Sequence, residues 1–290
     1  LEGSETEDNP SELTLEGSGT EDNPSELTLE GSGTEEDPYK IASLENLENF
    51  QAYVNSGGDT QGKYFFLPTN TNIVVEETEE KAWTPIGTPE HPFLGTFRAG
   101  GNVKLTLRSA GIESFTGDYA LFGENGGTIE NLTLYQQYVV NIGIGSQYAD
   151  RAAGIAIINR AGGKITGCYV GNSIIICAKN GAGGIAFENN GLIEDCEVGS
   201  KVGNTKIFSD MKKSRALTPY GGIVGKNNAG GKISNCTNWG VIGKSDEYAG
   251  GTTGRLGGIA GYNAGTIENC TNRGIITSFA LGDVKDEEPG

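Results

Sequence analysis

The stretch GGIAGYNAGTIENCTNRGIIT, residues 257–277, holds one full copy of the pattern that decides the fold. It contains short apolar runs separated by Gly and Asn. Related copies start at residues 119, 153, 183 and 221, so successive copies are 34, 30, 38 and 36 residues apart. Periods in this range are typical of a stacked array of repeats. We therefore expect the chain to fold as a solenoid.

The runs within each copy favour strands over helices. Each run is four to seven residues long, is flanked by Gly and is rich in Ile and Val. Three such runs suit one coil of a β-helix, whereas a propeller blade needs four antiparallel strands and about 40 residues. We predict an all-β, right-handed parallel β-helix in which successive coils pair.

The second run of each copy predicts a corner in the chain. Ile267 and Cys270 are three residues apart. Side chains on one face of a straight strand alternate with a period of two, so both can point inward only if the chain turns between them. In every copy, the residue just before Cys270 or its equivalent is of a type that tolerates left-handed backbone. These residues are Asn131, Gly167, Asp195, Asn235 and Asn269.

Aligning the copies stacks two further columns, which we predict to be structural. Stacked Asn side chains can hydrogen-bond along a solenoid. Successive strands lie about 4.8 Å apart, whereas a disulfide needs Cβ atoms near about 3.8 Å, so we expect free, buried thiols. The Asn column is Asn125, Asn159, Asn189, Asn227 and Asn263, and the inward column is Leu132, Cys168, Cys196, Cys236 and Cys270.

The N-terminal segment has a different character. LEGSGTEDNPSELT (15–28) nearly repeats residues 1–14, and a third copy begins at residue 29. Residues 1–42 carry thirteen acidic residues and one Lys, a net charge of −12, which leaves −5 of the total −17 for the rest. So little apolar surface cannot offset the entropy of ordering, and like charges repel. We predict that residues 1–38 form a disordered acidic tether.

Residues 43–56 are expected to form a capping helix. Leu44, Leu47, Phe50 and Val54 recur near helical spacing, and Ser43 is a suitable N-cap. Such a helix would cover the open end of the first coil. The expected domains are the tether (1–38), the cap and first coils (39–118), the repeated coils (119–282) and an acidic C-terminal tail (283–290).

Several phrases resemble a known family. WTPIG (83–87), PFLGTF (92–97), YALFGENGGTIENLTL (119–134) and residues 257–277 resemble the GLUG-motif repeats of adhesin-like surface proteins of gut-dwelling anaerobic bacteria. The resemblance covers roughly residues 40–280. It implies a right-handed parallel β-helix, export to the bacterial cell surface and an outer-membrane lipoprotein with a lipid anchor upstream of residue 1. The chain departs from the family at residues 98–101, so no acidic or metal-binding role is expected of that turn.

Few residues in the sequence suggest a catalytic site. His91 is the only histidine, which excludes an HExxH zinc site, and we expect no metal, no cofactor and no catalytic residues. The alternative is a polysaccharide lyase or another carbohydrate-active β-helix enzyme, with Glu130, Glu194 and Glu268 as candidate acids. No basic patch suggests nucleic acid, and no apolar run is long enough to span a membrane.

Binding is expected where the repeat is broken, at residues 199–220 and 243–256, because coil residues are committed to stacking. We expect residues 199–220 to be a removable surface loop without coil contacts. The predicted function is a non-enzymatic, adhesin-like protein that binds a glycan or a surface protein. A second alternative is an accessory surface lipoprotein of an outer-membrane nutrient-uptake (transporter) complex. The candidate ligand-binding residues are Lys206, Phe208, Lys212, Lys213, Arg215, Tyr220, Tyr248 and Arg255.

Overall fold

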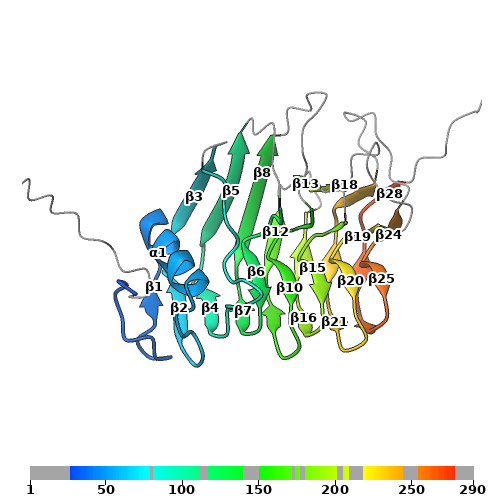
Figure 1. The fold of residues 1–290 in the computed structure, drawn as a ribbon. Coiled ribbons are helices and arrows are strands. Elements are labelled where there is room, and N and C mark those ends of the chain that lie inside the picture. Colours follow the sequence, from blue (N-terminus) through cyan, green and yellow to red (C-terminus); the bar gives the residue numbers. More distant parts are fainter. Residues whose placement is uncertain are drawn as a thin grey trace, which may run out of the picture.

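The structure is a computed structural model. It describes residues 27–78, 81–110, 117–139, 150–171, 174–176, 180–200, 205–208, 218–243 and 254–277. These residues form a parallel β-solenoid whose coils stack from the N-terminal end, at the left of Figure 1, to the C-terminal end at the right. The predicted all-β solenoid with a short helix is confirmed.

Five parallel sheets run along the solenoid, and each takes one strand from each coil that it crosses. Sheet I contains β1 (Tyr39–Lys40), β2 (Tyr64–Leu67), β4 (Thr96–Ala99), β7 (Thr128–Glu130), β11 (Lys164–Thr166), β16 (Leu192–Glu194), β21 (Lys232–Ser234) and β26 (Thr266–Glu268). Sheet II contains β6 (Phe122–Asn125), β10 (Ala156–Asn159), β15 (Ala186–Asn189), β20 (Val224–Asn227) and β25 (Ala260–Asn263).

The other three sheets complete each coil. Sheet III contains β3 (Asn72–Glu77), β5 (Lys104–Ala110), β8 (Thr133–Val139), β12 (Tyr169–Gly171), β17 (Glu197–Val198), β22 (Thr237–Asn238) and β27 (Thr271–Asn272). Sheet IV contains β13 (Ile174–Ile176), β18 (Lys206–Phe208), β23 (Val241–Gly243) and β28 (Ile276–Thr277). Sheet V contains β9 (Ala152–Ala153), β14 (Ala182–Gly183), β19 (Pro219–Gly221) and β24 (Arg255–Gly257).

The repeated coils hold five strands where the sequence predicted three. The first predicted run is split between sheets V and II because the chain bends at a residue pair such as Gly154–Ile155. The bend brings backbones close together: a Cβ at Gly184 would lie 2.1 Å from the carbonyl oxygen of Gly222. Glycine is the residue that permits such an approach.

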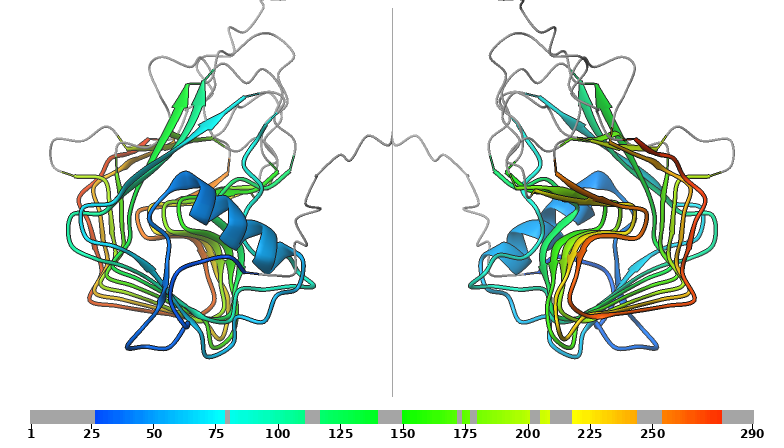
Figure 2. Two further views of the ribbon diagram at one scale, coloured as in Figure 1. Left: turned by 90° about the vertical axis from the view of Figure 1, so that its left-hand side faces the viewer. Right: turned by 90° about the vertical axis from the view of Figure 1, so that its right-hand side faces the viewer.

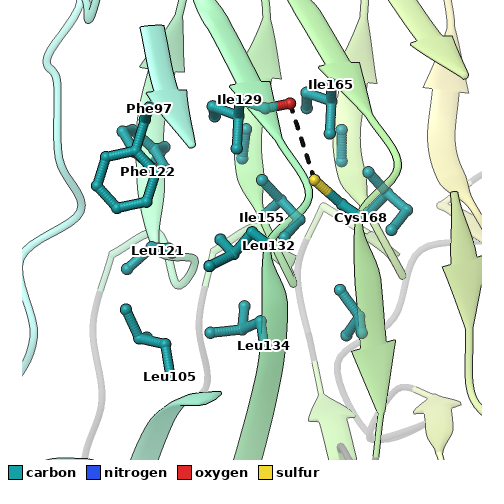
Figure 3. Close-up of a cluster of buried hydrophobic side chains, with 14 of the residues drawn as sticks. Phe97, Leu105, Leu121, Phe122, Ile129, Leu132, Leu134, Ile155, Ile165 and Cys168 are labelled. Carbon is teal, nitrogen blue, oxygen red and sulfur yellow. Dashed lines mark hydrogen bonds between the residues drawn. The ribbon is translucent and has the colours of Figure 1, made fainter. Parts of the chain in front are cut away.

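The predicted corner is confirmed between sheets I and III. Its residues all have left-handed backbone, with φ between 51° and 60°. Four of the five are not glycine, and Asn and Asp are the non-glycine residues that adopt this conformation most readily. The corner lets residues on both sides point inward. Figure 3 shows this in two neighbouring coils, with Ile129 and Leu132 beside Ile165 and Cys168.

Helix α1 (Leu44–Asn55) caps the N-terminal end, as predicted. The Ser43 side chain accepts a hydrogen bond from the Asn46 backbone N–H at 3.2 Å. Figure 2 shows the helix lying across the end of the coils. Its Phe50 ring is fully buried and lies 4.5 Å from the ring of Phe65 and 5.6 Å from that of Phe97, centroid to centroid. The helix therefore closes the core at this end.

The tether prediction needs a correction at its C-terminal part. Residues 1–26 lie outside the described residues, but residues 27–38 lie against the first coils. Leu27 and Leu29 pack on the core, and the Tyr64 N–H donates to the Gly33 carbonyl at 2.9 Å. The third copy of the acidic repeat is ordered because Leu29, together with Leu27 at the end of the second copy, finds an apolar surface. The predicted C-terminal tail, residues 283–290, also lies outside the described residues.

The prediction that residues 199–220 lack coil contacts is wrong. Strand β18 lies inside this segment and pairs with β13 on one side and β23 on the other. Ile207 is fully buried in the core, and Thr205 is buried beside it. The repeat pattern hid this strand because KIF (206–208) carries a single inward-facing residue without flanking Gly.

Candidate functional site

The Asn column is a hydrogen-bonded ladder, as predicted. The Nδ2 group of each Asn donates to the Oδ1 atom of the Asn in the next coil, at 2.8 to 2.9 Å. The four inner members, from Asn125 to Asn227, are fully buried. Because these side chains are buried, their amide groups are not available to a ligand.

A second, shorter ladder was missed in the sequence. Asn238 is fully buried, and its Nδ2 group donates to Asn272 Oδ1 at 2.8 Å. Its own Oδ1 atom accepts from the Gly240 N–H at 2.9 Å. The signal was present, because Asn238 and Asn272 both follow a Cys-Thr pair at one repeat position.

The stacked cysteines are free thiols in the part of the chain that the structure describes: Cys168, Cys196, Cys236 and Cys270. The fifth, Cys177, lies outside it. Hydrogen bonding to the neighbouring thiol, together with burial, raises the pKa of both Cys196 and Cys236 well above the ordinary value. Burial also raises the pKa of Cys270. The thiolate is the reactive form of cysteine, and a raised pKa disfavours it. These thiols are therefore poor nucleophiles, and their role is to fill the core.

The structure does not bring the predicted ligand-binding residues together in one site. Tyr220 is removed from the candidates because its side chain is fully buried in the core on β19. Lys206 is half-buried on β18, and Phe208 follows on the same strand. Arg255 is exposed on β24. Lys212, Lys213, Arg215 and Tyr248 lie outside the described residues.

Arg255 belongs to a larger surface feature that the sequence did not reveal. The residue immediately before each ladder Asn of sheet II forms a row that crosses five coils in register. Its spacing is that of paired strands, about 4.8 Å per coil. We call this row the outer strip: Glu124, Ile158, Glu188, Lys226 and Tyr262.

The outer strip covers a small apolar cluster that is separate from the main core. The cluster consists of Ala120, Ala153, Ile157 and Phe187, with Ile158 packed against it. Lys226 places its Nζ atom 5.0 Å from the centroid of the Phe187 ring. The Arg151 guanidinium carbon lies 5.9 Å from the same ring. The strip is thus a rigid surface, since its side chains rest on packed groups from neighbouring coils.

Ion pairs fix the charges along the strip. Arg160 Nε lies 2.7 Å from Glu124 Oε2, and Lys226 Nζ lies 3.1 Å from Glu188 Oε1. Arg151 forms a bidentate pair with Asp118, and this hydrogen bonding raises the pKa of Arg151. The carboxylates of Glu124 and Glu188 each have a cationic partner.

The most accessible part of the strip is its C-terminal end. The Tyr262 side chain is 40% exposed, and the Arg255 guanidinium carbon lies 5.4 Å from the centroid of its ring. An aromatic face beside a fixed guanidinium can stack on an apolar sugar face while donating hydrogen bonds to hydroxyl or carboxylate groups. The arrangement is therefore suited to binding.

The candidate acids of a lyase lie elsewhere, on the outer face of sheet I. Glu194 accepts a hydrogen bond from the Ser234 hydroxyl at 2.9 Å, and Glu268 pairs with Lys232 at 2.8 Å. Glu130 stands opposite Arg98 in the strand register. Within the described residues, no group of three His, Cys, Asp or Glu side chains is placed to hold a metal ion.

A sequence signal for the outer strip existed. In the first run of each copy, the position before the ladder Asn changes among Glu, Ile, Lys and Tyr, while the residue before it stays small or apolar and the Asn after it is constant. Variation at a fixed place in a repeat indicates a side chain that the stack does not constrain. What the linear sequence did not show is that Arg151, Phe187 and Arg255 gather around this row.

These features define a class, the parallel β-solenoid repeat proteins. More specifically, residues 252–277 match the family model of the GLUG motif. No curated protein and no solved structure matches the chain with significance. Among the described residues, no helix is long and apolar enough to cross a membrane.

Proposed function

We propose that this protein is a non-enzymatic, adhesin-like protein of the bacterial cell surface and that it binds a glycan on the outer strip. The observation that carries the proposal is the pairing of Tyr262 with Arg255 at the exposed end of the row. The GLUG match and the β-solenoid support a surface β-helix protein. An outer-membrane lipoprotein is the form in which we expect it to reach the surface.

The repeat of the strip supports a linear polymer as the ligand. Side chains recur about every 4.8 Å along the solenoid, a step close to the length of one sugar unit in an extended polysaccharide. The charge along the strip changes from acidic at Glu124 and Glu188 to cationic at Lys226 and at Arg255 beside Tyr262. A glycan lying along the strip would meet an aromatic ring at one end and charged hydrogen-bonding groups along its length.

The test is a glycan array with the full chain, followed by calorimetry with the glycan that binds best. Tyr262→Ala and Arg255→Ala should each lower the affinity about tenfold, because an aromatic or cation–π contact contributes about 0.5–2 kcal/mol. Leu94→Ala is the matched control, since Leu94 is 42% exposed and lies in the coil before Glu124, at the end of the strip opposite Tyr262. Unchanged binding by both strip variants would disprove the assignment of the site, and shortening of the glycan during the assay would favour an enzyme.

A further inference from the structure

Arg255 differs from the other cations at the outer strip. The others each form an ion pair with a carboxylate of the preceding coil: Arg151 with Asp118, Arg160 with Glu124 and Lys226 with Glu188. Among the residues that the structure describes, no carboxylate lies within 4.0 Å of the Arg255 guanidinium. Its neighbour is instead the ring of Tyr262, at 5.4 Å from the guanidinium carbon to the ring centroid.

The contact with Tyr262 leaves the donors of Arg255 open to a ligand. The attraction between a guanidinium and the face of a ring does not use the N–H groups as hydrogen-bond donors to oxygen. A guanidinium has five such donors in a fixed fork, which matches the two oxygens of a carboxylate. Both residues lie at the surface, since Arg255 is exposed and Tyr262 is 40% exposed. The pair therefore offers a ring face and an anion-binding fork side by side.

The rest of the strip is close to electroneutral, because each of its carboxylates lies beside a cation. Its charges also become more accessible towards Tyr262. The Glu124 side chain is 9% exposed, whereas that of Lys226, in the coil before Tyr262, is 37% exposed. A ligand on the strip therefore meets a neutral surface along most of its length. At the Tyr262 end it meets one positive charge that no described carboxylate neutralises.

The acidic N-terminal segment does not oppose an anion at this place. The described acidic residues before β1 lie at the opposite end of the solenoid from β24 and β25 (Figure 1). Six strands of sheet I separate β1 from β26 in the last described coil. Exposed charges are screened over about 8 Å at physiological ionic strength, which is less than two steps of about 4.8 Å between coils. Local charge therefore decides which ligand binds.

We propose that the ligand of the outer strip is an otherwise neutral glycan in which the sugar stacked on Tyr262 carries a carboxylate, as a uronic acid does. The carboxylate accepts hydrogen bonds from the Arg255 fork, and the sugar face packs on the ring. The other sugars are neutral, because a polymer with a carboxylate on every unit would place negative charges beside Glu188 and Glu124. This inference rests on the proposed function, since it names the ligand class of the same site.

The first experiment is a glycan array of matched probes, tested with the full chain. Each neutral oligosaccharide is printed beside the same chain terminated by glucuronic acid, and tetragalacturonate represents a polymer with a carboxylate on every sugar. We expect the acid-terminated chains to bind about tenfold more tightly than their neutral partners, because a hydrogen bond to a charged group is stronger than one to a neutral group. Tetragalacturonate should bind less tightly than the best acid-terminated chain.

The second experiment tests whether Arg255 receives the carboxylate. Calorimetry compares the best acid-terminated glycan with the same glycan after its carboxyl group has been reduced to an alcohol. The parent should prefer the acid about tenfold, Arg255→Gln should lose this preference, and Arg255→Lys should keep only part of it, since Lys has the charge without the fork. Lys104→Gln is the matched control. It removes one exposed positive charge from β5 in sheet III and should leave the preference unchanged.

The outcomes distinguish this inference from the proposed function. If the parent binds the acid and its reduced form equally, the inference is wrong, and the proposed function stands provided that Tyr262→Ala weakens the binding of both. A preference for the acid that persists in Arg255→Gln would also overturn the inference, because the carboxylate would then bind elsewhere. Tighter binding of tetragalacturonate than of every acid-terminated chain would contradict the neutral character of the other sugars. If no glycan binds, the proposed function fails and the inference fails with it.

Discussion

Replacing Asn189 by Ala removes the middle member of the long ladder. Its Nδ2 group donates to Asn227 Oδ1 at 2.9 Å and to the Lys232 carbonyl at 3.2 Å. Its Oδ1 atom accepts from Asn159 Nδ2 at 2.8 Å and from the Gly191 N–H at 3.2 Å. The substitution therefore removes four hydrogen bonds at a fully buried position.

The expected loss follows from these contacts. Each hydrogen bond contributes about 0.5–1.5 kcal/mol, and a buried group left without a partner costs about 1–3 kcal/mol. Because Asn159 keeps its bonds to the carbonyl groups of Gly163 and Leu192, the partners are only partly deprived. We expect Asn189→Ala to lower the free energy of unfolding by about 3–5 kcal/mol.

The matched control is Asn263→Ala, at the exposed end of the same ladder. That residue accepts one bond from Asn227 and donates one to Gly265, and water can replace both. The expected loss is about 1 kcal/mol or less. The measurement is urea unfolding followed by circular dichroism, with hydrogen exchange to test whether the coils unfold together. Equal losses for the two variants would refute the view that burial of the ladder stabilises the solenoid.

Two further predictions concern the first coils. Phe50→Ala should lower the free energy of unfolding by about 3–5 kcal/mol, since it empties a buried aromatic site, while Glu45→Ala on the exposed face of α1 should stay within about 0.5 kcal/mol of the parent. Burial raises the pKa of Glu77, against the hydrogen bonds that it accepts from Tyr119 and from the backbone of Trp83. The protonated form is therefore favoured by folding, and its contribution to stability is complete below the ordinary pKa of 4.5 and is lost as the pH rises through the folded-state value. Glu77→Gln should raise the urea midpoint at neutral pH and lose that advantage in acid; an advantage that is the same at both pH values would show that ionisation of Glu77 is not the cause.

Much of the fold could be predicted because each coil repeats the same local rules. The Gly-flanked Ile and Val runs predicted strands, and the three-residue spacing of Ile267 and Cys270 predicted the corner found at Asn269, where φ is 51°. Ser43 and the helical spacing of Leu47 and Phe50 predicted α1. These features depend on neighbours in sequence and on the alternation of side chains along a strand, both of which are visible in the linear chain.

The site was predicted poorly because its residues come together only in the folded coil. Arg255 was the one predicted binding residue that the described structure places on an exposed surface beside an aromatic ring. Tyr220 was expected in a loop but fills the core, and Ile207 within the supposed loop is a coil residue. In the sequence, long irregular stretches hide Ile207 and Tyr220 from the repeat pattern. In the fold, their strands pair in register with the strands of neighbouring coils, in sheets IV and V.

The sequence by itself determined the repeat, the strands, the corners, the thiol column and the Asn ladder, since all of these follow from side chains that recur at one position in every copy. Only the tertiary structure decided which variable positions become neighbours. Stacking brings Glu188 and Lys226, 38 residues apart in the chain, to 3.1 Å and sets both near Phe187 and Arg151. It also decided that the two ends of the described chain differ, because α1 covers one cross-section of the core while Ile275 in the last described coil is 61% exposed. The physical reason is that hydrogen bonding between coils fixes the register of neighbours along the solenoid axis, a direction in which residues adjacent in the sequence make no contact.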